Sequence, residues 1–286
     1  MGRLRAGPNT CAARVDLKIG PFLVRIGVQS PCAMQNDFPT DEVLSHTAHR
    51  PWPMPDGPWI MTQSWHDLLF AHWAVSVREL REKVPAGFEL DLFEGHAYIG
   101  VVPFRMTNVA PRGVPAMPFV SAFAEMNVRT YVTFGGKPGI YFFSLDADSQ
   151  MAVTVARTMF RLPYFTASMD VRRDDGSISY RSERTSRDGA LAEFSARYRP
   201  VGPVYHSAPG ELDWFLTERY CLYTLDDEFL AYRLQIHHPP WPLQRAEAEI
   251  ELNTMVEAAG IRLPPMAPLL HFAKRQDMVA WPMERV

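Results

Sequence analysis

Hydrophobic and polar residues alternate over much of the chain after residue 59, in short segments separated by Gly, Pro and Asp. Such period-two runs, bounded by turn residues, are typical of β-strands with one buried face. The clearest case is a hairpin, in which the alternating stretch 88–93 is followed by the turn at Glu94 and Gly95 and by a return strand at 97–106. We expect further strands at 65–77, 123–133, 139–145, 165–173, 177–185, 194–199, 221–225, 229–237, 246–252 and 272–281.

Helical periodicity is confined to a few segments. Asp148 or Ser149 can cap a helix that runs to about Arg161 and is ended by Pro163. Apolar residues recur in it at i, i+4, i+8 and i+11, a spacing that predicts one buried face. That face consists of Met151, Val155, Met159 and Leu162.

Shorter helices are expected at 76–83 and 212–220, with a helical turn at 253–259. Many strands and two or three flanking helices in one continuous run predict an α+β, β-rich fold. The architecture that we expect is an antiparallel β-barrel or sandwich.

Residues 1–50 differ from the rest because they lack a sustained period and carry scattered Pro, Ser, Thr and Asn. The proline-rich run 51–58 then acts as a stiff, extended entry. We therefore expect 1–50 to be a poorly ordered N-terminal tail or arm, and 51–286 to be a single domain. An alternative start at Met34, Met54 or Met61 would remove much of this segment.

The composition excludes several classes of protein. A chain of 286 residues, 47% of them hydrophobic, can bury a sizeable core without disulfides. The net charge is −3 and no basic block is present, so we expect no nucleic-acid partner. No apolar run is long enough for a membrane span, and no signal peptide is evident. Three scattered cysteines (Cys11, Cys32 and Cys221) favour the reducing cytoplasm as the location.

A polar row stands out in the strand expected at 123–133. Glu125, Asn127, Arg129 and Tyr131 share one strand face, while apolar residues fill the other. In one interpretation the polar face meets water. In the other it lines an internal cavity, where unpaired charges need partners or a ligand because each would otherwise cost several kcal/mol.

Metal and cofactor chemistry finds little support in the motifs. His237 and His238 are adjacent, so on a strand they point to opposite faces and cannot bind one ion. Ser144 lacks the glycines of a nucleophile elbow, and no Gly-rich phosphate loop is present. We expect no metal and no cofactor.

Several longer stretches resemble the YqjF-like proteins, a bacterial family of unknown function. Together the matching stretches cover about residues 59–281, and several are long and composition-specific. They are 65–73, 95–104, 125–131, 141–146, 156–157, 162–165, 218–220 and 238–242.

That family is similar in turn to acetoacetate decarboxylase, through 80–85 and through a helix that ends in a proline-led turn at 163–165. The resemblance implies an antiparallel β-barrel with flanking helices and an internal pocket, and it allows a homo-oligomer. In the decarboxylases a pair of lysines follows the turn, and one of them forms the Schiff base. Here the two positions are Tyr164 and Phe165, and the chain has only four lysines. The resemblance places Glu125 at a pocket glutamate and His66 near a pocket arginine of the decarboxylases.

Three functional hypotheses follow. The first is a small-molecule-binding barrel without Schiff-base chemistry, whose ligand is unknown. The second is a lysine-independent enzyme, lyase-like or hydrolase-like, acting on a small carboxylate or β-dicarbonyl compound, with Glu125 and Tyr164 as the catalytic candidates. The third is a structural or partner-binding module. The candidate ligand-binding residues are Glu125, Asn127, Arg129, Arg157, Tyr164 and His66.

Overall fold

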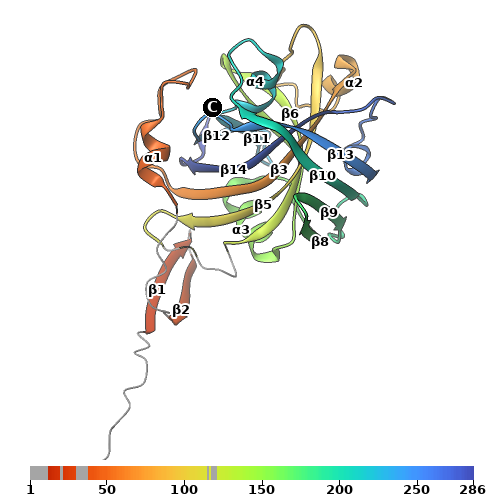
Figure 1. Cartoon of the computed structure of the whole chain (residues 1–286). Helices are drawn as coiled ribbons and strands as arrows, with labels where there is room; N and C mark the ends of the chain where they lie inside the picture. The colour runs from red at the N-terminus through yellow and green to blue at the C-terminus, as the bar shows by residue number, and fades with distance from the viewer. Residues whose placement is uncertain (1–11, 20–21, 30–37, 115, 117–120) are drawn as a thin grey trace, which may run out of the picture. The chain divides into compact units, whose positions relative to one another are not determined.

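Long antiparallel strands dominate the computed structural model, which describes residues 12–19, 22–29, 38–114, 116 and 121–286 (Figure 1). The chain divides into two units, 1–37 and 38–286. In the first unit, β1 (Ala12–Ile19) and β2 (Phe22–Gln29) pair as an antiparallel hairpin. Cys11, Cys32 and the alternative start at Met34 lie outside the described residues.

The second unit combines many strands with a few short helices. Its strands are β3 (Met61–Val75), β4 (Glu89–Leu90), β5 (Ala97–Pro111), β6 (Phe123–Phe134), β7 (Lys137–Ala147), β8 (Tyr164–Asp174), β9 (Ser177–Arg184), β10 (Glu193–Tyr205), β11 (Cys221–Leu225), β12 (Ala231–His237), β13 (Leu243–Asn253), β14 (Leu269–Ala280) and β15 (Glu284–Arg285). Its helices are α1 (Thr40–Ser45), α2 (Val77–Arg81), α3 (Gln150–Phe160), α4 (Leu212–Thr217) and α5 (Met255–Ala258). The prediction of a β-rich fold with few helices is confirmed. None of these helices is both long and apolar enough to cross a membrane.

Thirteen strands of the described chain form one hydrogen-bonded sheet. Their order is β15-β12-β11-β7-β8-β9-β10-β13-β14-β3-β5-β6-β4. Two additional pairings, β6 with β7 and β12 with β14, connect strands that stand apart in this order. Helices α3 and α4 lie at opposite ends of the sheet, and β6 runs between these ends (Figure 1).

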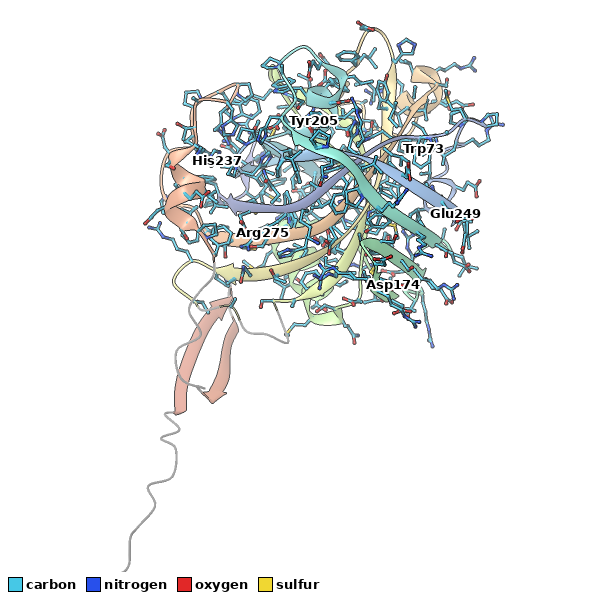
Figure 2. All side chains as sticks on the ribbon, in the orientation of Figure 1. Trp73, Asp174, Tyr205, His237, Glu249 and Arg275 are labelled. Atoms are coloured by element: carbon cyan, nitrogen blue, oxygen red, sulfur yellow. The ribbon has the colours of Figure 1, made fainter. Side chains whose placement is uncertain are left out.

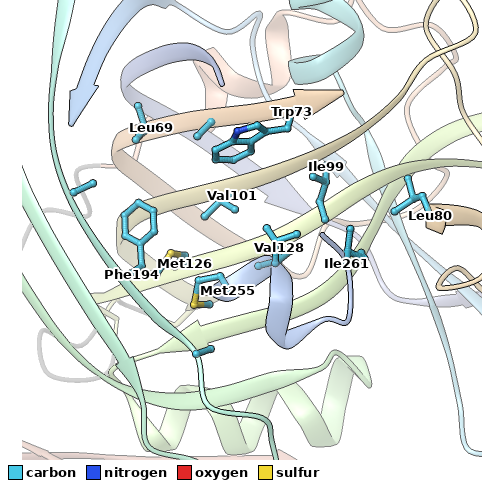
Figure 3. Packing of buried hydrophobic residues seen from close by; sticks show 14 of the residues in the cluster. Leu69, Trp73, Leu80, Ile99, Val101, Met126, Val128, Phe194, Met255 and Ile261 are labelled. Carbon is cyan, nitrogen blue, oxygen red and sulfur yellow. The ribbon is translucent and has the colours of Figure 1, made fainter. Parts of the chain in front are cut away.

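The largest hydrophobic cluster covers one face of β3, β5 and β6. Strand alternation produces it, because every second residue of each strand points to the same side. Met126 and Val128 of β6 therefore pack in this cluster, while their neighbours in sequence point to the other face (Figure 3). Its labelled members are Leu69, Trp73, Leu80, Ile99, Val101, Met126, Val128, Phe194, Met255 and Ile261.

Helix α3 begins and ends as predicted but packs through a different face. The Ser149 hydroxyl accepts a hydrogen bond from the Ala152 N–H and caps the helix. The expected buried stripe is wrong, since Met151, Val155 and Met159 are 49%, 38% and 47% exposed. Instead Val153 is buried, in a cluster that also contains the predicted Leu162 and the partly buried Ala156 and Phe160. Two apolar stripes were available on this short helix, and the one facing β7 and β8 is buried.

Residues 38–50 pack within the second unit, whereas the sequence predicted a boundary at residue 50. Phe38 and Val43 are buried together with Val279 and Trp281. The imidazole Nε2 of His237, at the end of β12, lies 2.9 Å from the Val43 carbonyl oxygen in α1 (Figure 2). Burial of apolar side chains at this level is what distinguishes a packed segment from a terminal tail.

Candidate functional site

The polar row on β6 is buried along its whole length. Glu125, Asn127 and Arg129 are 3%, 5% and 7% exposed, and Tyr131 is completely inaccessible. The interpretation in which this face meets water is therefore wrong. On β5 the paired positions are Phe104, Val102 and Gly100, so the row is flanked by two apolar side chains and one glycine. The row begins beside Tyr164, which follows α3, and finishes beside Leu216 of α4.

At the α3 end of the row, Glu125 meets Tyr164. Strand β8 runs parallel to β7, with Leu145 opposite Tyr164, and this places the phenol beside the acid. The Tyr164 O–H donates to Glu125 Oε2 over 2.9 Å. Burial raises the pKa of Glu125 to about 8, and the negative charge of Asp146 adds to the rise, although the Tyr164 hydrogen bond opposes it. The carboxyl group is therefore mostly protonated at neutral pH and can give or take a proton near that pH.

At the other end, Arg129 has no carboxylate partner among the described residues. Its Nη2 donates to the Leu216 carbonyl oxygen over 3.2 Å, while its buried Nε has no hydrogen-bond partner. The guanidinium carbon lies 5.3 Å from the centre of the Phe70 ring. Two other buried arginines differ in this respect, because Arg184 pairs with Asp146 and Arg219 pairs with Asp91.

His72 adjoins Arg129, although the sequence did not predict it as a site residue. Its Nε2 lies 2.6 Å from the Tyr131 hydroxyl oxygen, and the Tyr131 O–H donates to the Leu216 carbonyl over 2.7 Å. Complete burial, together with the nearby Arg129 charge, lowers the pKa of His72 well below its usual value. The imidazole is therefore neutral. The signal that could have found it is register, since His72 pairs with Gly100 and Gly100 pairs with Arg129 across three strands.

Gly100 leaves the space in which His72 and Arg129 meet. A Cβ atom at this position would lie 2.9 Å from His72 Cδ2 and Nε2, and 3.5 Å from Arg129 Cγ. The first distance is shorter than a carbon–carbon van der Waals contact, so the imidazole would have to move. Only a residue without a side chain allows the two polar groups to approach each other across β5.

Replacing Gly100 by alanine is expected to destabilise the fold by about 1–3 kcal/mol, because the new methyl group overpacks a buried site. Urea unfolding of wild type and Gly100→Ala measures this difference. Gly87→Ala is the matched control, since no atom lies within 4 Å of a Cβ there and the backbone does not adopt positive φ. That control should be neutral or slightly stabilising. Equal stability of the two variants would show that the contact over Gly100 is not tight.

The structure does not bring the remaining two predicted residues to this face. The Arg157 side chain is exposed, with Nη1 2.7 Å from Asp188 Oδ2, and it lines a polar depression of about 440 Å³. It reaches the row only through the backbone, because its Nε donates to the Tyr164 carbonyl oxygen over 2.5 Å. His66 pairs with Arg105, which pairs with Ala124, so strand register places His66 on the face opposite Glu125. Burial, and then the charge of Arg275, lower the pKa of His66 to about 4.

The lysines of the second unit lie away from the row. Lys274 is 69% exposed and its Nζ lies 2.8 Å from Asp67 Oδ1. The Nζ of Lys137 lies 5.6 Å from the centre of the Trp52 ring, and Lys83 is exposed on the surface. None of the three has a hydrogen bond or ion pair with Glu125 or Tyr164 in the described structure. No group of three His, Cys, Asp or Glu side chains that could hold a metal ion occurs among the described residues.

Comparison with known proteins matches most of the chain to a family of unknown function. Residues 62–277 match the model of DUF2071, a family of uncharacterized conserved proteins. The chain is 51% identical over 232 residues to the uncharacterized protein YqjF of Bacillus subtilis (strain 168), covering 81% of this chain and 95% of that protein.

Solved structures of similar fold are much more distant in sequence. The enduracididine biosynthesis enzyme MppR complexed with pyruvate is 10% identical with a TM-score of 0.54, over 83% of this chain and 93% of that one. Acetoacetate decarboxylase from Legionella pneumophila is 14% identical with a TM-score of 0.52, over 84% and 93%. An acetoacetate decarboxylase-like enzyme from Sphingomonas wittichii RW1 is 13% identical with a TM-score of 0.55, over 84% and 98%. These likenesses show a shared acetoacetate decarboxylase-like fold.

Proposed function

The chain belongs to the DUF2071 family of uncharacterized conserved proteins and is similar to YqjF, and we propose that it binds a small carboxylate on the buried polar face of β6. The site would be formed by Glu125, Asn127, Arg129 and Tyr164. The carboxylate would lie against Arg129, and the far end of the ligand would reach Glu125 and Tyr164. The Cα atoms of Glu125 and Arg129 are about 13 Å apart along an extended strand, which suits a molecule of a few carbon atoms between their side chains.

We infer further that the sheet closes into a barrel around this site. Pairing of β6 with β7 and of β12 with β14 supports closure, because following hydrogen-bonded neighbours from β7 leads back to β7. The circuit passes through β6, β5, β3, β14, β12 and β11. A closed barrel of this kind can hold one small ligand in its interior.

The unpaired charge of Arg129 is the observation that carries the proposal. Removing a guanidinium from water without a counterion is unfavourable by several kcal/mol, and buried ions in proteins are normally paired. Arg184 and Arg219 follow that rule, whereas in the described structure Arg129 forms no ion pair and contacts the Leu216 carbonyl oxygen, Tyr131 and the Phe70 ring. An anionic ligand would be the missing partner, because it would accept a charge-assisted hydrogen bond from the Nε–H of Arg129.

The protonated Glu125 supports a ligand with a second polar end. At neutral pH this carboxyl group can donate a hydrogen bond to a ligand oxygen, and Tyr164 fixes its orientation. One protein of the same fold, MppR, is complexed with pyruvate. That analogy supports the carboxylate class, although fold alone does not determine function.

Schiff-base decarboxylation does not belong to this proposal, because Tyr164 and Phe165 occupy the positions of the lysine pair. Incubation with acetoacetate and borohydride should leave the mass of the protein unchanged. A reduced covalent adduct on Lys83, Lys137 or Lys274 would contradict this prediction. Lysozyme carried through the same borohydride treatment gives the background of nonspecific lysine reduction.

A second candidate is a lysine-independent enzyme on the same site, and the carboxyl pKa of about 8 favours it. Glu125 would transfer a proton to or from a carboxylate or β-dicarbonyl substrate, assisted by Tyr164. NMR of such compounds incubated with the protein would detect turnover. Loss of turnover in Glu125→Gln, with binding retained, would favour this candidate over simple binding.

Native mass spectrometry of freshly purified protein tests the binding proposal. We expect a noncovalent adduct whose released component is detected as a small organic anion. Release of a cationic or purely apolar molecule from the protein would contradict the carboxylate assignment.

A further inference from the structure

Next to Arg129, two buried acceptor atoms on the same sheet face lack hydrogen-bond partners. They are His72 Nδ1 and Asn127 Oδ1. Both side chains are at least nine-tenths buried. An acceptor that loses its water without gaining a donor is unfavourable by about 1–3 kcal/mol, so buried acceptors are normally satisfied. The two unpaired acceptors therefore indicate that a ligand in this site would provide a hydrogen-bond donor.

The hydrogen bonds around Tyr131 determine which nitrogen of His72 carries the proton. Tyr131 has one O–H, and it donates to the Leu216 carbonyl oxygen. The contact between Tyr131 and His72 Nε2 must therefore have the imidazole as donor. Since the ring is neutral, Nδ1 carries a lone pair and no proton. His72 thus presents an acceptor as its remaining polar atom.

Strand register places this acceptor beside the proposed carboxylate site. Strand pairing aligns His72 of β3 with Gly100 of β5 and with Arg129 of β6. The side chains of His72 and Arg129 therefore point to the same face of the sheet. The Nε2 and Cδ2 edge of the ring faces Gly100, so the Nδ1 edge is the one turned away from β5. Asn127 lies two residues before Arg129 on the same face of β6.

We propose that the ligand is a small hydroxycarboxylate, whose hydroxyl group donates a hydrogen bond to His72 Nδ1 or Asn127 Oδ1 while its carboxylate lies on Arg129. This inference rests on the proposed carboxylate site and specifies the ligand class. A keto group at the same place would only accept hydrogen bonds, so it would face two lone pairs and leave both acceptors unpaired. An ammonium group could donate, but it would lie close to the Arg129 charge, which disfavours it.

Calorimetric titration with matched pairs tests the inference. The probes are lactate against pyruvate and 3-hydroxybutyrate against acetoacetate, and each pair differs only in the oxidation state of one carbon atom. We expect the hydroxy acid of at least one pair to bind about tenfold or more tightly than its keto partner, because only the hydroxyl satisfies a buried acceptor.

Two variants of His72 identify the residue that discriminates. His72→Gln keeps a donor near the position of Nε2 but removes the acceptor at Nδ1, so the ratio of the two affinities should fall toward one. His72→Asn places an amide oxygen near Nδ1 and should retain more of the preference. In wild type, the ¹⁵N resonance of His72 Nδ1 should have the shift of an unprotonated nitrogen and should move when the hydroxy acid binds.

The outcomes separate the inference from the function on which it rests. Equal or tighter binding of the keto acids would overturn the hydroxycarboxylate assignment and leave the carboxylate site in place. A preference that survives unchanged in His72→Gln would also overturn the role of His72. Failure of all four acids to bind would overturn the inference, and the carboxylate proposal would fall with it if no other small carboxylate bound.

Discussion

Replacing Arg129 by methionine is expected to leave the protein as stable as wild type, or to stabilise it by up to about 2 kcal/mol, while abolishing carboxylate binding. Arg129 is a buried charge without a carboxylate partner in the described structure. Exchanging such a group for an apolar side chain of similar size removes a desolvation penalty. The Leu216 carbonyl keeps its hydrogen bond from Tyr131. Urea unfolding without added ligand measures the change.

Arg184→Met is the matched control, because Arg184 is 6% exposed and Arg129 is 7% exposed. Arg184 Nε lies 2.6 Å from Asp146 Oδ1 and Nη2 lies 2.8 Å from Oδ2. Removing it leaves a buried carboxylate without its counterion, so we expect a loss of about 3–5 kcal/mol. An equal decrease in the free energy of unfolding of both variants would show that Arg129 already has a structural partner in the protein. Its charge would then not require a ligand.

The contribution of Glu125 to the free energy of unfolding should fall as pH rises from about 4.5 to 8, whereas buried histidines with a lowered pKa, such as His66 and His72, contribute in the opposite direction. The Glu125 carboxyl group has an ordinary pKa of 4.5 and a pKa of about 8 in the folded protein. Below pH 4.5 both states are protonated and the contribution is fully present. Between the two values the unfolded chain has lost the proton while the folded chain keeps it. This contribution therefore declines with pH, by on the order of 5 kcal/mol in total.

Glu125→Gln isolates this contribution, because an amide cannot titrate and can still accept the Tyr164 hydrogen bond. The difference in unfolding free energy between variant and wild type should be small at pH 4.5 and should grow in favour of the variant up to pH 9. Urea unfolding across this pH range measures it, and other titrating groups cancel in the difference. A difference that does not depend on pH would show that Glu125 is ionised in the folded state.

The sequence predicts which side chains of a single strand point to the same face. Alternation alone places Glu125, Asn127 and Arg129 on one face, and the structure buries that face. Alternation also predicts the two possible environments of this face, but it cannot choose between water and an interior. That choice depends on which elements cover the face, and α4 and β8 come from segments distant in sequence.

Features that depend on pairing between strands could not be predicted in this way. His72 meets Arg129 only because the β3–β5 and β5–β6 registers align both with Gly100. A shift of one residue in either register would place His72 and Arg129 on opposite faces. The prediction of the buried side of α3 was wrong for a related reason. Two apolar stripes fit the helical period, and the strands against which the helix packs determine which stripe is buried.

Titration of small carboxylates into wild type and Arg129→Met, followed by calorimetry, is the most direct test of the proposed site. A panel of two- to six-carbon hydroxy, keto and unsubstituted acids covers the proposed class. We predict that wild type binds at least one of them and that the variant binds it about 30-fold or more weakly, because the charge partner of the ligand has gone. Equal affinity in the two proteins, or no binding to wild type across the panel, would contradict the account.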